Sequence, residues 1–126
     1  MASRIFRDIQ ALNLKSVVII GSFRPNGTSA VDNTLNTGQG YTVARSGVGI
    51  FTITLNDKYV SCLSATTGLA LSAVADTALQ FGAIDVSSAG TLVLNVLTAG
   101  VAADIASNAA NRIHFTLVLS NSNVTA

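Results

Sequence analysis

The feature that most constrains the fold is the stretch YTVARSGVGIFTITL, residues 41–55. Apolar and polar residues alternate on both sides of a short turn that contains Gly47 and Gly49. Successive side chains of a strand point to opposite faces, and glycines suit the tight turn of a hairpin. Before the turn, Tyr41, Val43 and Arg45 share one face and Thr42, Ala44 and Ser46 the other. After the turn, Phe51, Ile53 and Leu55 lie opposite to Thr52 and Thr54. The stretch therefore predicts two antiparallel strands.

Further short runs rich in β-branched and aromatic residues recur at roughly ten-residue spacing. They predict strands at residues 15–23, 59–65, 79–86, 90–98 and 112–120. In the last of these, Ile113, Phe115, Leu117 and Leu119 share one face. Many short strands separated by turn residues indicate an all-β chain, and we predict an antiparallel β-sandwich or jelly roll.

Three segments between these runs are less regular. Residues 28–40 are polar and contain several Asn and Gly, which predicts a long loop. Residues 99–111 suit a loop or a single helical turn. Residues 68–78 (GLALSAVADTA) suit a helix by their Ala and Leu content, but their place among strands favours a strand, which is our prediction.

The N-terminal residues differ from the rest, and we divide the chain into an arm, residues 1–14, and a single β-sandwich domain, residues 15–126. The spacing of Ile5, Ile9 and Leu12 fits a short helix, either packed on its own domain or docked on a neighbour. Burying four large apolar side chains gains roughly 6–12 kcal/mol. Ordering a dozen residues costs roughly 12–24 kcal/mol. We therefore expect an extended or short-helical arm that is mobile in the isolated chain and ordered by assembly.

The low charge of the chain predicts a surface covered by partners. Charged residues make up 10% of the sequence, whereas about a quarter is usual. The net charge of +1 gives no field that favours nucleic acid or anionic lipid. No apolar run approaches the ~20 residues that span a bilayer. The N-terminus lacks the apolar core of a signal peptide, and the single cysteine, Cys62, allows no internal disulfide, so we expect synthesis in a reducing cytoplasm.

Residues that could perform catalysis are few and scattered. The chain has one histidine, His114, one cysteine, Cys62, and no glutamate. Two such singletons in strands are more often core residues than a nucleophilic pair, and they cannot by themselves complete a zinc site. We interpret Asp32 and Asp57 as turn formers, and Asp76, Asp85 and Asp104 as local hydrogen-bond acceptors. We therefore predict no enzyme, no catalytic residues, no cofactor and no metal.

The strands also suggest self-association. In three of them the second face carries Val, Leu or Ile, so both faces of a sheet need a cover, which a neighbouring subunit can supply. Arg45 and Arg112 lie in predicted strands, where we expect each to meet an Asp or a backbone carbonyl across a subunit boundary.

The order GYTVARSGVGIFTITL, YVSCLSA and NRIHFTLVLSNS resembles the small β-sandwich virion proteins of tailed bacteriophages, particularly head decoration (cement) proteins. It is also similar to the trimeric jelly-roll modules related to C1q that end phage fibres. The resemblance covers about residues 41–120. The positions that match are Val43, Arg45, Gly47, Gly49, Phe51, Ile53, Thr54 and residues 113–119.

This resemblance implies a homotrimer that binds the major capsid protein at symmetric junctions on the outer surface of a virion. The short arm and the lack of a coiled coil favour a decoration protein over a fibre tip. The alternatives are another virion component, such as a tail, baseplate or fibre-tip module, or a carbohydrate- or receptor-binding β-sandwich. The contact residues that we expect are Arg4, Ile5, Phe6, Arg7, Ile9, Arg45 and Arg112.

Overall fold

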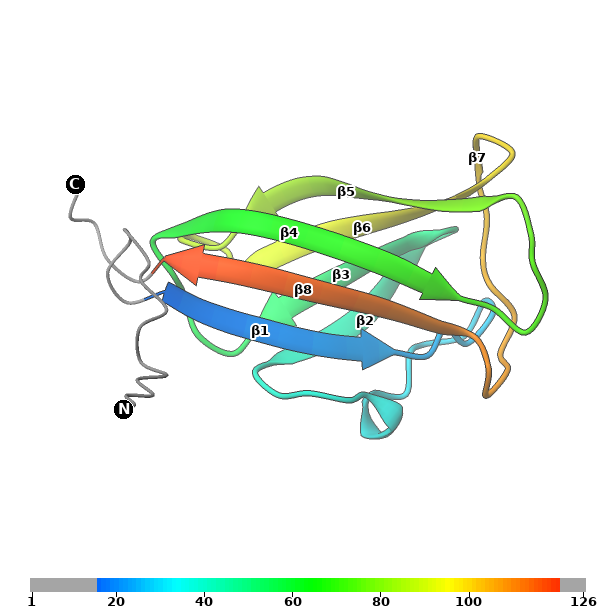
Figure 1. Ribbon diagram of the computed structural model, residues 1–126, viewed down its shortest axis with the longest axis horizontal. Coiled ribbons are helices and arrows are strands. Elements are labelled where there is room, and N and C mark those ends of the chain that lie inside the picture. The colour runs from blue at the N-terminus through cyan, green and yellow to red at the C-terminus, as the bar shows by residue number, and fades with distance from the viewer. Residues whose placement is uncertain (1–15, 121–126) are drawn as a thin grey trace, which may run out of the picture.

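The computed structural model describes residues 16–120, which form a sandwich of two antiparallel sheets (Figure 1). Sheet A has the strand order β1 (Ser16–Phe23), β8 (Arg112–Ser120) and β4 (Ser61–Ala70). Sheet B has the order β2 (Tyr41–Gly47), β3 (Ile50–Leu55), β6 (Thr91–Thr98) and β5 (Thr77–Asp85), with the short β7 (Val101–Ala102) beside β6. The predicted all-β sandwich is confirmed, while the arm, residues 1–14, lies outside the described residues.

The hairpin predicted at residues 41–55 is present as β2 and β3. Val43 lies opposite Ile53, and Arg45 opposite Phe51, so the face expected to be apolar is the one that enters the core. At the turn, Gly49 has a φ of +65°, a left-handed conformation that residues with a side chain rarely adopt. Alternation and glycine placement together therefore predicted this element correctly.

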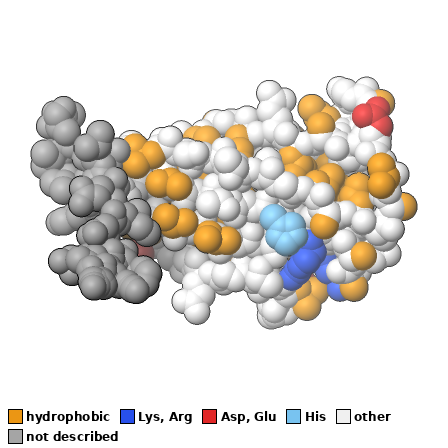
Figure 2. Space-filling model, viewed as in Figure 1, with side chains coloured by type: hydrophobic (Ala, Val, Ile, Leu, Met, Phe, Trp, Pro, Cys, Tyr) orange, Lys and Arg blue, Asp and Glu red, His pale blue; other side chains and the backbone are white. Residues whose placement is uncertain are grey.

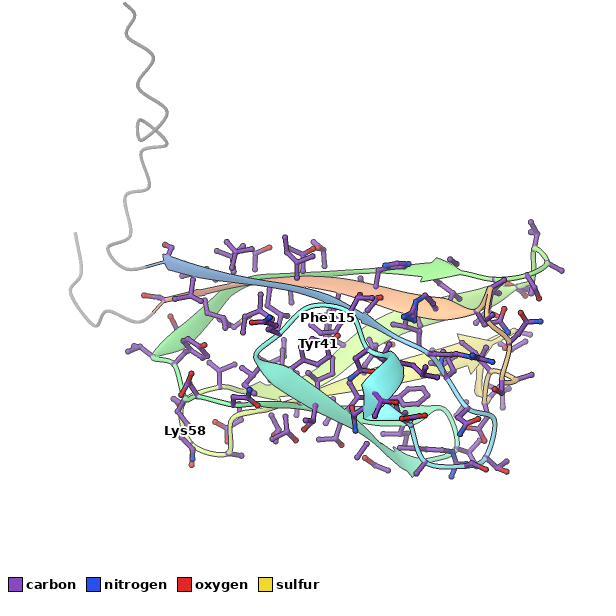
Figure 3. The ribbon with its side chains drawn as sticks, turned by 90° about the horizontal axis from the view of Figure 1, so that it is seen from below. Tyr41, Lys58 and Phe115 are labelled. Carbon is purple, nitrogen blue, oxygen red and sulfur yellow. The ribbon has the colours of Figure 1, made fainter. Side chains whose placement is uncertain are left out.

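The core lies between the sheets and follows the alternation of their central strands. Sheet A contributes the predicted inward face of β8, and sheet B contributes β3 and β6. The buried side chains from these strands are Ile113, Phe115, Leu117, Leu119, Phe51, Ile53, Leu92, Leu94 and Val96. The rings of Tyr41 and Phe115 meet edge to face, with centroids 4.8 Å apart, between the two layers (Figure 3). Lys58, by contrast, lies at one end of the sandwich.

The strand predicted at residues 68–78 is wrong. β4 begins at Ser61 rather than at residue 59 and ends at Ala70, and β5 begins at Thr77, so residues 71–76 form a connection. The physical reason is that β4 belongs to sheet A and β5 to sheet B, and the chain must cross between the layers here. Val74, in this connection, is fully exposed and packs on neither sheet. Residues 99–111 form a loop that contains β7, without a helical turn.

The predicted loop at residues 28–40 covers the side of the sandwich formed by β1 and β2. It contains a 3-10 turn, Asn33–Leu35, which Asp32 caps by accepting a hydrogen bond from the backbone N of Thr34 at 3.0 Å. Asn33 donates to the carbonyl oxygen of Val43 at 3.1 Å and accepts from its backbone N at 2.9 Å. Thr37 exchanges two backbone hydrogen bonds with Ser22 of β1. Both edge strands on this side are therefore partly paired by the loop.

Candidate interaction surface

The outer face of sheet A exposes apolar side chains in adjacent rows. Val18 of β1 lies opposite Val118 of β8, and Ile20 lies opposite Thr116. Val18 is 55% exposed and Ile20 is 63% exposed. Figure 2 views this face and shows separate apolar side chains over it, with the histidine and a cluster of basic side chains toward one end. An antiparallel sheet that faces water normally carries polar residues there, so this face is suited to being covered.

The outer face of sheet B differs in chemistry. Thr42, Thr54 and Thr91 lie side by side across β2, β3 and β6. The hydroxyl groups of Ser46 and Thr52 are 2.5 Å apart on the same face. Val93 and Leu97 of β6 also lie on this face but are half-buried, whereas Val18 and Ile20 of sheet A are more than half exposed. Sheet A is therefore the better candidate for an apolar interface.

A second feature is an open groove of about 560 Å³ between β4 and β5, on the side opposite the loop of residues 28–40. Its walls include Val60, Cys62, Leu63, Phe81, Ile84 and Asp85. Three of these apolar side chains, Val60, Leu63 and Ile84, are at least 40% exposed. Sequence reasoning missed this groove because its two walls belong to different sheets and lie about twenty residues apart.

Both strands that border the groove are irregular where they line it. The pairing of β4 with β8 shifts between Cys62 and Ser64, and the pairing of β5 with β6 shifts between Phe81 and Ile84. Within residues 16–120 no strand pairs with the outer edge of β4 or of β5. Bulges on edge strands interrupt the row of backbone groups that a further strand would need. The groove is therefore shaped for side chains rather than for an added strand.

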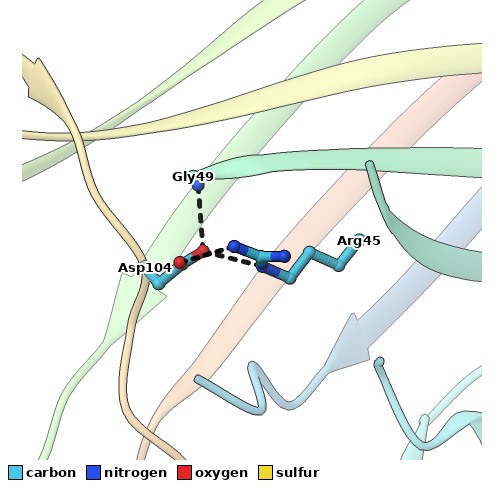
Figure 4. A network of polar contacts seen from close by, with 3 residues as sticks. All are labelled: Arg45, Gly49 and Asp104. Carbon is cyan, nitrogen blue, oxygen red and sulfur yellow. Dashed lines mark hydrogen bonds and ion pairs between the residues drawn. The ribbon is translucent and has the colours of Figure 1, made fainter. Parts of the chain in front are cut away.

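Arg45 is held by a partner within its own chain (Figure 4). Its Nη2 lies 2.7 Å from Oδ2 of Asp104 and its Nε lies 3.0 Å from Oδ1, a bidentate arrangement. The backbone N of Gly49 also donates to Oδ1 of Asp104, at 3.0 Å. The guanidinium group of Arg45, followed by this amide, lowers the pKa of Asp104. The interpretation of Asp104 as a local acceptor is wrong, because both donors lie more than fifty residues away.

Arg112 is also engaged within the chain. Its Nη2 and Nη1 donate to the carbonyl oxygen of Leu35 at 2.6 and 3.2 Å. The partners of Arg45 and Arg112 are thus a carboxylate and a carbonyl, as expected, but they belong to the same chain and not to a neighbouring subunit. A further contact of either residue with another subunit or a capsid stays a prediction. Arg4, Ile5, Phe6, Arg7 and Ile9 lie outside the described residues.

The single cysteine and the single histidine do not meet. Cys62 lies opposite Leu119 and packs against the core, where burial raises the pKa of its thiol. His114 lies opposite Ser22 and is exposed on the outer face of sheet A. Among residues 16–120, no three His, Cys or Asp side chains are grouped as metal ligands. In the same part of the chain, no helix has the length and apolar character needed to cross a membrane.

Comparison with known proteins adds no relative. No protein-family model, no curated protein and no solved structure matches the chain.

Proposed function

We propose that the chain is a structural protein that self-associates, as a homotrimer, and decorates the outer surface of a bacteriophage capsid, where it binds the major capsid protein. The observation that carries this proposal is the outer face of sheet A. Val18, Ile20 and Val118 are adjacent there, and no Lys, Arg or Asp of residues 16–120 lies in their two rows. The same rows continue with Thr116, Ser64 and Thr66, so the gain from burial in an interface comes from the three apolar side chains.

The free energy gained by burying this face is small for one copy, which suits a protein that binds at many equivalent sites. Full burial of a Val or Ile side chain gains about 1.5–3 kcal/mol, and roughly half of each is still exposed here. One such face therefore contributes only a few kcal/mol per copy. Symmetric association multiplies this contribution, and a ligand that binds only the assembled shell stabilises the shell by its binding free energy.

The carbohydrate-binding alternative finds less support in the structure. Sugar-binding surfaces of β-sandwiches commonly use exposed aromatic rings as apolar platforms. Here Tyr41, Phe23, Phe51 and Phe115 are buried in the core. Tyr59 and Phe81 are half-buried and pack against it. A different virion component, such as a tail or fibre-tip module, fits the same face, and the location of the protein on the particle separates it from a capsid-decorating role.

Two measurements test the proposal. Light scattering coupled to size exclusion gives the solution mass over a wide concentration range, and a stable mass near three protomers is the expected result. In immunogold electron microscopy of the bacteriophage particles, antibodies raised against the chain should then label the heads. A monomer at every concentration would contradict self-association. Label confined to tails would replace the capsid by the other virion role.

A further inference from the structure

The side chains that line the groove between β4 and β5 indicate the chemistry of a segment that would bind there. Its apolar walls include Phe81, Leu63 and Ile84, and Phe81 packs against the core at its base. Asp85 lines one wall, and no Lys, Arg or His does. A ligand that fits would insert apolar side chains and carry positive charge beside them.

We infer that the groove receives residues 5–12 of a second copy of this chain. These residues, IFRDIQAL, carry apolar side chains at Ile5, Phe6, Ile9 and Leu12. Arg4 and Arg7 flank the first pair and outnumber the one carboxylate of the segment, Asp8, so the segment carries a net charge opposite to that of Asp85. This inference rests on the self-association proposed above and names a second contact within the same assembly.

The described chain begins at Ser16, at the same end of the sandwich as the start of the groove. Ser16, Ser120 and Ser61 lie side by side at one end of sheet A, and the groove begins at Val60 and Ser61. Neighbouring strands are about 4.8 Å apart, so Ser16 lies roughly 10 Å from this end of β4. Residues 13–15 can span about 10 Å when extended. The segment that precedes them therefore leaves the domain at the end where the groove begins, within reach of the groove of a copy that meets this end.

Two arguments favour the groove of a neighbour over the groove of the same copy. Within one copy, the segment would have to pass the ends of β8 and β4, where Val60 donates to the carbonyl of Ser120 and Tyr59 donates to that of Val86. In addition, the burial of four apolar side chains does not by itself offset the cost of ordering the segment. Association with a second copy also buries the apolar face of sheet A, and this burial adds to the free energy gained by docking the segment.

Cys62 provides a direct test, because it lines the groove and is the only cysteine of the chain. We would measure the rate at which a maleimide labels Cys62 in the full chain at one pH, from dilute to concentrated protein, and the solution mass of the same samples. Labelling should slow about tenfold as the oligomer forms, the ratio that corresponds to 90% occupancy of the groove. The double variant Phe6→Ser, Ile9→Ser should keep the fast rate at every concentration.

A matched variant, Gln10→Ser, Asn13→Ser, changes polar residues of the same region and should behave as the unaltered chain. If the oligomer forms but Cys62 stays equally reactive, or if the Phe6→Ser, Ile9→Ser variant remains protected, the groove assignment is overturned while self-association stands. If the unaltered chain stays monomeric and its Cys62 is labelled more slowly than Cys62 of the Phe6→Ser, Ile9→Ser variant, the segment occupies the groove of its own copy. That result would overturn the second copy as the occupant. A monomer with a reactive Cys62 would overturn both proposals.

Discussion

Val18 lies directly opposite Val118 in the antiparallel pairing of β1 with β8, on the outer face of sheet A. Because Val18 is 55% exposed, Val18→Asp should leave the core intact and place a charge on this face. A carboxylate that must be desolvated opposes association, so the mass measured by light scattering should fall to that of the monomer. Ala44→Asp, on the exposed outer face of sheet B, is the matched control and should keep the oligomer. Loss of the oligomer in both variants, or in neither, would argue against sheet A as the interface.

Gly49 combines a left-handed backbone with close packing. A Cβ atom at this position would lie 2.6 Å from the carbonyl oxygen of Val96 and 2.7 Å from the backbone N of Ala103. Gly27 has a similar φ of +61° but no atom near the position of a Cβ. Gly27→Ala should therefore cost only the backbone strain, about 1–2 kcal/mol, and Gly49→Ala should cost clearly more. Urea denaturation of both variants measures the difference, and equal losses would show that the close contacts at Gly49 are relaxed at no cost.

The hydrogen bonds to Asp104 should make the stability depend on acidity. Donation from Arg45, and then from Gly49, lowers the pKa of Asp104 in the folded chain. An unfolded aspartate titrates near pH 3.9. The stabilisation is therefore fully present above about pH 4 and is lost as the pH falls through the lower, folded pKa.

In Asp104→Asn this titration is absent, so the melting temperature should be lower at pH 7 and should fall less steeply between about pH 4 and pH 2. Thermal unfolding followed by circular dichroism at several pH values measures both effects. A slope that is unchanged in Asp104→Asn would assign the acid sensitivity to other groups.

The hydroxyl group of Tyr41, in β2 of sheet B, contacts both β1 of sheet A and the loop of residues 28–40. It donates to the carbonyl oxygen of Ser22 at 2.9 Å and also contacts that of Thr37. Both carbonyls keep a backbone donor, so Tyr41→Phe should cost only about 0.5–1.5 kcal/mol, measured by urea denaturation. Tyr59→Phe is the control, because among residues 16–120 its hydroxyl group has no hydrogen-bond partner. A Tyr41→Phe variant as stable as the parent would show that water replaces this bond without cost.

The alternation of residues made the strands and their buried faces predictable. In β2, β3 and β8 the apolar residues at every second position are those that the structure buries. The irregular segments were harder, and residues 68–78 show why. Their composition is compatible with a strand, but the chain crosses from sheet A to sheet B there, and this follows from how the strands pair rather than from local preference.

The same distinction applies to the polar contacts. Asp32 behaves as a turn former because its partner, Thr34, is two residues away. The pairing of Arg45 with Asp104 and the pairing of Asn33 with Val43 depend on chain segments that only the fold brings together. No local pattern distinguishes Asp104 from Asp85, whose carboxylate accepts from nearby Ser88.

By itself the sequence determined the regularly alternating strands, such as β2, β3 and β8, with their inward faces, because side chains alternate along a strand and core positions select apolar residues. Only the tertiary structure decided that β1, β8 and β4 form one sheet with exposed Val18 and Ile20, and that β4 and β5 border an open groove. The physical reason is that strand partners are chosen by long-range packing and backbone hydrogen bonds, which leave no periodic trace in the sequence.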